Sequence, residues 1–495
     1  MKLRTVLPLS VILLGIAAFY ILTLRRGNFW ADDYALYIHH AKNIVEGRPY
    51  ADTDYIYNPD VADYSPRAYP PVFPLFLAPV YRAFGFNFLA MKFEVVTFFL
   101  LTLIVLAFYW RGDLRRPYLI ALLLILGLSP IFWGFKDSVV ADIPFLFFFY
   151  LVVWVTQSAP RNTSMWWAWA VTNGLLLYLC AGTRTIGLTL IPGFLFYELL
   201  SYRRLTRFTA ISLAVCTAFL LMQRRIFGSG EQSYTDQLHP TLSTLLFNAK
   251  QYPHDFMMLW TYSLGLGLCV ALFLITTVVV CYGFAIHLKH RLTVLDVFLV
   301  PYLGMVLLWP APQGIRFLLP VIPYYVYLML LGLQGLPTFL PVQWTKVATA
   351  TILLLIATSY AAAFRHATYG TIRQTDGRTS FNDLCRFIDD HTSQQDVFIF
   401  RRSRALSLFT SRPAAMYDLR DDNHLATYLA SIHANYIVSS PIFDEDRTIL
   451  TPFIHSHANQ LTEVYENPDF QVYRVLYDSP SAQANAPITL IPTHQ

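Results

Sequence analysis

The sequence contains little charge and few cysteines. Only 14% of its 495 residues are Asp, Glu, Lys or Arg, whereas 55% are hydrophobic. This balance excludes a soluble protein of this size and predicts a polytopic membrane protein. The net charge of +5 is spread through short loops, so no nucleic-acid partner is expected. Four of the five cysteines, Cys180, Cys216, Cys269 and Cys281, lie in apolar segments, which excludes a disulfide framework and a cysteine-based metal site.

Long apolar runs recur through the first three quarters of the chain. The first run follows Lys2 and Arg4 and lacks a small-x-small cleavage pattern, which indicates a signal-anchor helix rather than a cleaved peptide. Runs long enough to span a bilayer occur near residues 5–24, 88–110, 118–134, 143–157, 165–182, 186–201, 208–222, 257–286, 293–309, 318–338 and 345–364. They predict an α-helical polytopic membrane protein with about eleven transmembrane helices.

Basic residues set the expected orientation of these helices. If the helices alternate, one side receives Lys2, Arg4, Arg111, Arg115, Arg116, Arg161, Arg203, Arg204, Arg207, Lys289, Arg291 and Lys346. The positive-inside rule makes that side cytoplasmic. The other side then receives the loop 25–87, the loop 134–142, the turn at Arg184, the loop 223–256, the turn 310–317 and the tail. Polar residues that are unusual for their surroundings are therefore expected to meet on one extracytoplasmic surface.

The tail, residues 365–495, differs from the preceding 364 residues in composition. Charge rises, apolar runs shorten, and alternating patterns appear. The patterns predict helices over 381–391 and 421–433, strands over 396–400 and 436–439, and a closing strand pair over 461–465 and 470–475. We expect a transmembrane domain over 1–364 and a small C-terminal α/β domain outside the membrane over 365–495.

The stretch 28–49 follows the first apolar run and carries two adjacent acids, Asp32 and Asp33. Tyr34, Tyr37, Ile38, Ala41 and Val45 recur at helical spacing, which predicts an amphipathic helix along the membrane surface with both acids in its first turn. Acids at this position commonly cap free N–H groups, so capping competes with a catalytic role.

Four further residues stand out on the same expected surface. Arg67 precedes Pro70 and Pro71 and is either an interfacial arginine or a phosphate ligand. Asp142 stands at a helix entrance before a proline, which is also typical of a cap. An arginine at depth costs about 3 kcal/mol at a helix centre, so Arg184 is expected to face a cavity, a phosphate or an aspartate. Arg316 lies on the side that the positive-inside rule disfavours, and could hold a phosphate bidentately.

Several of these segments resemble motifs of the GT-C membrane glycosyltransferases. Asp33, Tyr37, Ala41-Lys42 and Gly47 resemble the first-loop motif, nearest to the branch of protein O-mannosyltransferases and lipid A aminoarabinose transferases, in which Asp-Glu is followed by Tyr, Ala-Arg and Gly. The pair here is Asp-Asp, and the spacing to Tyr37 favours Asp33 as the equivalent of the catalytic acid. The later segments are similar to other elements of the superfamily: Pro70-Pro71, Ser138 to Pro144, Arg184 to Gly187, and Arg316 to Pro320.

The resemblance implies a glycosyltransferase that moves a sugar from a polyprenyl-phosphate-linked donor to a hydroxyl of a lipid, polysaccharide or protein. It implies Asp33 as general base, with Asp32 as a cap or auxiliary acid. It places Arg316, Arg184, Asp142, Arg67 and Tyr37 around the donor phosphate and the substrate. Such chemistry requires one base and inverts the sugar carbon, because a phosphate leaving group needs no protonation.

By the same resemblance, no cofactor is required, and a role for a divalent metal stays open. The expected location is the cytoplasmic (inner) membrane of a bacterial cell envelope, with the active site facing out. A flippase for lipid-linked sugars and an inactive accessory protein are the alternatives. The Asp52-Thr53-Asp54 segment is interpreted as a loop, and His39-His40 make a poor metal pair because adjacent residues point to different faces of a helix.

Overall fold

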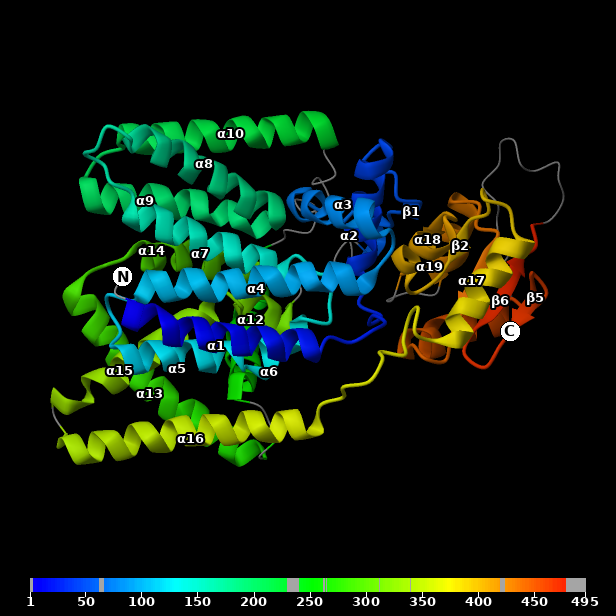
Figure 1. Ribbon diagram of the computed structural model, residues 1–495. Coiled ribbons are helices and arrows are strands. Elements are labelled where there is room, and N and C mark those ends of the chain that lie inside the picture. The colour runs from blue at the N-terminus through cyan, green and yellow to red at the C-terminus, as the bar shows by residue number, and fades with distance from the viewer. Residues whose placement is uncertain are drawn as a thin grey trace.

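A computed structural model describes residues 3–61, 66–228, 240–260, 263, 265–310, 312–338, 340–418 and 423–477. Long helices lie side by side in one part of the molecule, and a smaller α/β unit lies beyond one end of them (Figure 1). The helices α2 and α3 stand between these two parts. This junction is where the candidate site lies.

The expected apolar runs form helices, but a further helix, Leu242–Met257, lies in the stretch 223–256, which was expected to be a loop. Their bounds are α1 (Leu3–Leu22), α4 (Phe88–Trp110), α5 (Arg116–Gly127), α6 (Pro130–Phe135), α7 (Asp142–Ser158), α8 (Trp166–Thr183), α9 (Leu190–Tyr202), α10 (Arg207–Phe227), α12 (Leu242–Met257), α13 (Leu266–His290), α14 (Val294–Leu308), α15 (Val321–Gly335) and α16 (Val342–His366). Within the described ranges, six helical stretches are long and apolar enough to cross a membrane. The chain is therefore an integral membrane protein, whereas the count of about eleven spans stays a prediction.

The expected boundaries differ from the structure at two runs. The run 118–134 divides into α5 and α6 at Ser129, because Pro130 favours the first turn of a new helix. In the run 257–286, α12 ends at Met257, a 3₁₀ helix, η3, spans Met258–Trp260, and α13 begins at Leu266. Helices α13 and α15 approach closely through Gly283 and Gly332, where an added Cβ would overlap a carbonyl oxygen of the other helix. Small residues commonly allow such close packing between membrane helices.

The first large loop contains α2 (Asp33–Glu46), β1 (Tyr55–Ile56), η1 (Pro59–Val61) and α3 (Val72–Phe84). Helix α2 ends at Gly47, which adopts the left-handed conformation with φ of 69°. Nine of the 14 residues of α2 are buried. The helix is thus largely enclosed, because α3 packs on one side and the α/β unit covers another.

The chain entering α2 is held by buried charges of the helical part. The side-chain carboxylate of Asp137 accepts a hydrogen bond from the Arg25 backbone N–H at 2.9 Å and pairs with Lys136. The ammonium group of Lys92 donates to the carbonyl oxygens of Arg25 and Gly27. These contacts fix the chain five residues before the candidate acids.

The α/β unit comprises α17 (Thr379–His391), β2 (Phe398–Ile399), α18 (Ser403–Thr410), β3 (Ala414–Ala415), α19 (Asn423–Ser431), β4 (Tyr436–Ser439), η7 (Asp446–Leu450), α20 (Thr451–Ser456), β5 (Leu461–Glu466) and β6 (Gln471–Val475). The expected helix near 381–391, the strands near 396–400 and 436–439 and the closing strand pair are confirmed. Of the expected helix 421–433, residues 421 and 422 lie outside the described residues. The boundary between residues 364 and 365 stays a prediction.

The first loop contributes to this unit directly. In the described residues, six strands form one sheet in the order β1-β3-β2-β4-β6-β5, and β1 from the first loop pairs parallel to β3. Trp30 inserts its ring into the apolar core of the unit, with ring centroids 5.0 Å from Phe381 and 5.4 Å from Phe443. The segment leading to Asp32 and Asp33 is therefore anchored in both parts of the molecule.

Candidate active site

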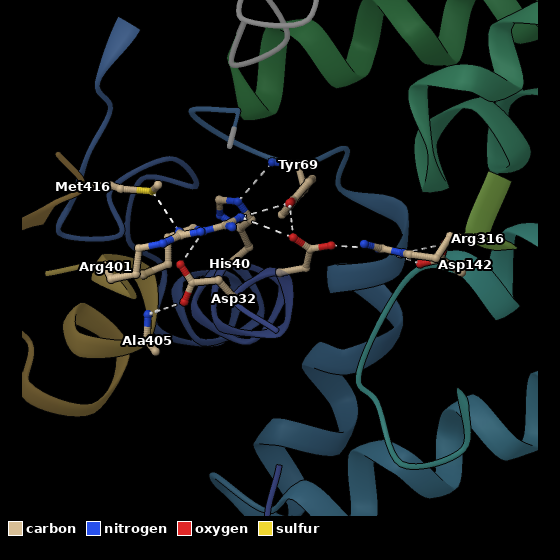
Figure 2. A network of polar contacts seen from close by, with 10 residues as sticks. Asp32, His40, Tyr69, Asp142, Arg316, Arg401, Ala405 and Met416 are labelled. Carbon is tan, nitrogen blue, oxygen red and sulfur yellow. Dashed lines mark hydrogen bonds and ion pairs between the residues drawn. The ribbon is translucent and has the colours of Figure 1, made fainter. Parts of the chain in front are cut away.

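A network of polar contacts joins the helices to the α/β unit (Figure 2). Asp33 takes part in three contacts of this network. Arg316 Nη2 donates to Asp33 Oδ2 at 2.7 Å, and the Tyr69 hydroxyl donates to Asp33 Oδ1 at 2.8 Å. Arg404 Nη1 lies 3.5 Å from Asp33 Oδ1. Asp33 is the first residue of α2, so its carboxylate stands at the end of that helix which faces the network.

Arg316 bridges two carboxylates. It lies in η5 (Gly314–Leu318), between α14 and α15, and donates from Nη2 to Asp142 Oδ2 at 3.0 Å as well as to Asp33. Asp142 begins α7, and its side chain is fully buried. Arg184, at the end of α8, donates to the same Asp142 carboxylate and lies over the ring of Phe317. Of the partners expected for Arg184, the structure therefore shows an aspartate, Asp142.

Asp32 has a different environment from Asp33. It occupies the N-cap position of α2 but makes no side-chain cap hydrogen bond there, so the prediction that it caps this helix is wrong. Arg404 Nε donates to Asp32 Oδ2 at 3.2 Å, and the Ala405 backbone N–H donates to Asp32 Oδ1 at 3.2 Å. The Asp32 carboxylate thus accepts a hydrogen bond from a free backbone N–H in the first turn of α18, a helix distant in sequence. It also pairs with the Arg404 guanidinium from the same turn.

Tyr69 is positioned by aromatic and histidine neighbours. The ring of Tyr37 stacks on that of Tyr69 with centroids 4.4 Å apart. The Tyr69 backbone N–H donates to His40 Nε2 at 3.3 Å, and His40 Nδ1 contacts the Tyr50 carbonyl oxygen at 2.8 Å. Burial lowers the pKa of His40 to about 4, so its ring is neutral at pH 7 and can accept that hydrogen bond. Tyr37 is buried beneath Tyr69, where it holds the ring that contacts Asp33.

The charges of this network balance. Three arginines, Arg184, Arg316 and Arg404, surround three aspartates, Asp32, Asp33 and Asp142. Such pairing is required because a buried charge without a partner is costly.

The pKa of Asp33 reflects these neighbours. Burial alone would raise this pKa, but the charges of Arg316 and Arg404, together with the hydrogen bonds from Arg316 and Tyr69, outweigh it. The pKa is therefore held well below its usual range, and Asp33 is ionised at neutral pH. An ionised carboxylate beside two guanidinium groups can accept a proton on one of its oxygens, while a guanidinium group binds an anion nearby.

The other predicted residues lie at varying distances from this network. Arg67 is exposed, two residues before Tyr69 in the segment that leads to α3. His39 Nε2 lies 3.9 Å from Asp54 Oδ2, whereas His40 contacts Tyr50 and Tyr69. Asp54 lies just before β1. Across the described ranges, no group of three or more His, Cys, Asp or Glu residues is placed to hold a metal ion.

Sequence reasoning missed Arg404, Tyr69 and His40. Arg404 was overlooked because it lies in the tail, 372 positions from Asp32. A signal was present, since Arg401, Arg402 and Arg404 cluster before a short apolar stretch. Arg401 donates to Glu445 within the α/β unit at 2.9 Å. Arg404, by contrast, contacts Asp32 before α2 and Tyr69 before α3.

Comparisons with known proteins give a likeness in structure. No protein-family model and no curated protein sequence matches the chain. The crystal structure of ArnT from Cupriavidus metallidurans bound to undecaprenyl phosphate is 13% identical, with a TM-score of 0.58 over 96% of this chain and 98% of that chain.

Two other solved structures share the likeness. The archaeal oligosaccharyltransferase AglB from Archaeoglobus fulgidus, in complex with an inhibitory peptide and a dolichol-phosphate, is 12% identical, with a TM-score of 0.60 over 97% of this chain and 76% of that chain. The arabinofuranosyltransferase AftD from Mycobacteria is 14% identical, with a TM-score of 0.54 over 94% of this chain and 40% of that chain. At these identities the likeness shows the fold.

Proposed function

Because this chain has the GT-C fold of membrane glycosyltransferases, as its motifs predicted, we propose that it transfers a sugar from a polyprenyl-phosphate-linked donor to an acceptor hydroxyl. The observation that carries the proposal is the carboxylate of Asp33 beside the guanidinium of Arg316, 2.7 Å apart and partly exposed. One group can take a proton and the other can hold a phosphate. The lipid phosphates bound to ArnT and AglB support a donor of that class.

In the proposed reaction, the acceptor oxygen forms a bond to the anomeric carbon of the sugar while the bond from that carbon to the phosphate oxygen breaks. The acceptor proton passes to Asp33. The departing phosphate keeps the bonding electron pair, and Arg316 and Arg184 stabilise its charge. A single base and direct displacement invert the configuration at the sugar carbon.

The existing ion pairs supply a means of coupling donor binding to base strength. Arg316 donates to both Asp33 and Asp142, so a donor phosphate competes with these carboxylates for the same N–H groups. When the phosphate takes Arg316, Asp33 loses its nearest cation and its pKa rises toward the usual range. Asp33 then becomes a stronger base only when the donor is in place.

Further parts of the proposal follow the sequence and fold. Tyr37 stacks on Tyr69, and the exposed Arg67 precedes Tyr69 by two residues, and we assign both to substrate binding. About eleven helices span a bacterial inner membrane, and the α/β unit and the site face away from the cytoplasm, in agreement with the basic clusters on the other side. No cofactor is needed for the displacement, because arginines provide the charge that stabilises the leaving group.

Mass spectrometry of cell-surface glycans and glycolipids tests the function. Cells lacking the protein are complemented with wild type, Asp32→Asn or Asp33→Asn at matched expression. We expect a sugar-sized mass to return fully with wild type and in reduced amount with Asp32→Asn, which keeps Asp33 but loses the charge that Arg404 contacts, and to stay absent with Asp33→Asn. Full restoration by both variants would overturn the role of Asp33 as base and favour a flippase or an accessory protein.

A further inference from the structure

We propose that the α/β unit supplies Arg404 to the active site as a positioning residue, so that Asp32, Asp33 and Tyr69 are aligned for transfer only while this unit is docked on α2. The proposal rests on the proposed transferase function and extends it. It makes the α/β unit a part of the catalytic site in addition to any role in acceptor recruitment.

The contacts of Arg404 carry the proposal. Its guanidinium is almost entirely buried and reaches three side chains of the first loop. Nε donates to Asp32 at 3.2 Å, Nη1 donates to the Tyr69 hydroxyl oxygen at 3.0 Å, and Nη1 lies 3.5 Å from Asp33. Because Tyr69 accepts from Arg404, its own hydroxyl proton is directed at Asp33. One arginine thereby sets the orientation of both carboxylates and of the tyrosine between them.

The segment that carries Arg404 has little freedom to move independently of α2. The Ala405 N–H donates to Asp32, and the Ser407 hydroxyl donates to the Asp54 carbonyl oxygen at 3.1 Å. Strand β1 extends the sheet of the α/β unit, and the ring of Trp30 lies in the core of that unit. Four separate ties thus join α18 and its neighbours to the first loop. Docking and alignment of the site are consequently one event.

Arg404 also differs from Arg316 in what it does during turnover. The groups that face Asp33 are Arg316 from η5, Arg404 from α18, Asp142 from α7, the Tyr69 hydroxyl, and Asp32 one residue before it. A donor phosphate draws Arg316 away from Asp33, whereas Arg404 stays bound to Asp32 and remains nearby. Arg404 therefore keeps Asp33 ionised and ready to accept a proton after the donor binds.

Transfer measured against pH provides the first test. Membranes of cells lacking the protein serve as the source of donor and acceptor, and purified wild type, Arg404→Met, Arg404→Lys or Arg412→Met is added. Arg412 is a matched control, because it is also buried in the α/β unit and pairs with a carboxylate, that of Asp389 at 3.3 Å, which is not among the contacts of the site. It also donates to the carbonyl oxygens of Thr410, Asp389 and Thr392.

We expect Arg404→Met to reduce transfer at least 10-fold at neutral pH and to move the acid limb of the profile upward by about 1 to 3 pH units. Arg404→Lys should restore part of that displacement, because it retains the positive charge. Arg412→Met should keep the wild-type acid limb. An acid limb that does not move in Arg404→Met, or that moves equally in Arg412→Met, would contradict the proposal.

Melting temperature measured against pH in detergent decides the question without any transfer. A carboxyl whose pKa is depressed by a partner stabilises the fold above its unfolded pKa, and this stabilisation is lost as the pH falls through the folded pKa. The gap between wild type and Arg404→Met should therefore be full from about pH 7 to about pH 5 and should narrow as the pH falls below about 4. A gap that stays constant with pH would show that Arg404 acts by packing alone. Wild type that forms no product would overturn the transferase function, while this second measurement still decides on Arg404.

Discussion

Replacement of Asp33 by Asn should separate donor binding from chemistry. The substitution keeps the size of the side chain and removes its charge, so three arginines then face two aspartates, Asp32 and Asp142. The proposed general base is lost, and transfer should fall by about 100- to 10,000-fold. Binding of a lipid phosphate should become tighter, because Arg316 no longer has a second charged partner.

The size of the binding effect follows from the contact that is removed. Arg316 donates to Asp33 at 2.7 Å, and a hydrogen bond to a charged group contributes about 1.5 to 3 kcal/mol. Both side chains are partly exposed, which favours the lower end of that range. We therefore expect undecaprenyl phosphate to bind about 10-fold more tightly to Asp33→Asn than to wild type.

Native mass spectrometry of the purified protein, titrated with undecaprenyl phosphate, measures this difference. Asp32→Asn is the matched control, since the same change is made one residue earlier and the contacts observed for Asp32 are with Arg404 and Ala405. Its affinity should equal that of wild type. Weaker binding by Asp33→Asn, or transfer at the wild-type rate, would refute the competition between phosphate and carboxylate for Arg316.

Three further outcomes are expected. Arg316→Lys should raise the apparent KM for the donor at least 10-fold in the membrane assay, because an ammonium group lacks the planar fork with which a guanidinium binds a phosphate bidentately. An unchanged KM would count against Arg316 as a phosphate ligand. Burial lowers the pKa of His39 to about 3 and of His40 to about 4, so the unfolded chain binds more protons than the folded chain below about pH 6.5. Acidification from about pH 7 to about pH 5 should therefore lower the free energy of unfolding by roughly 2 kcal/mol per histidine. His40→Gln should weaken the pH dependence of the melting temperature. Lys136→Met should destabilise the fold by about 3 to 5 kcal/mol by leaving Asp137 buried and unpaired, whereas adding Asp137→Asn should recover part of the lost melting temperature.

The helical part of the fold and half of the site could be predicted from local sequence. Apolar runs identified the long helices because burial in a bilayer demands a continuous apolar segment. Arg184 was identified because an arginine at depth is costly, Arg316 because it lies on the side that the positive-inside rule disfavours, and Asp142 because it stands at a helix entrance before a proline. The structure pairs both arginines with Asp142. Their spatial proximity to Asp33 followed from the expected sidedness of the loops.

The other half of the site depends on pairing between distant segments. Nothing in the sequence near Asp32 indicates that its partner is Arg404, and local capping rules gave the wrong partner for that carboxylate. Strand β1 has only two residues, which is too short for an alternating pattern to be recognised in the sequence. It is defined by its pairing with β3. Tyr69 stands next to Pro70-Pro71, and no local pattern indicates that its hydroxyl group contacts Asp33.

The sheet that takes its edge strand from the first loop has a consequence for biogenesis. At about 5 to 20 residues per second, a ribosome makes Arg404 roughly 20 to 75 s after Asp32, which precedes it by 372 positions. Throughout that interval the nascent chain exposes both acids and an unpaired β1. A partly synthesised chain, or one that has been clipped between α16 and α17, would therefore hold lipid-inserted helices without an assembled catalytic centre, and loss of the tail would silence the protein without removing it from the membrane.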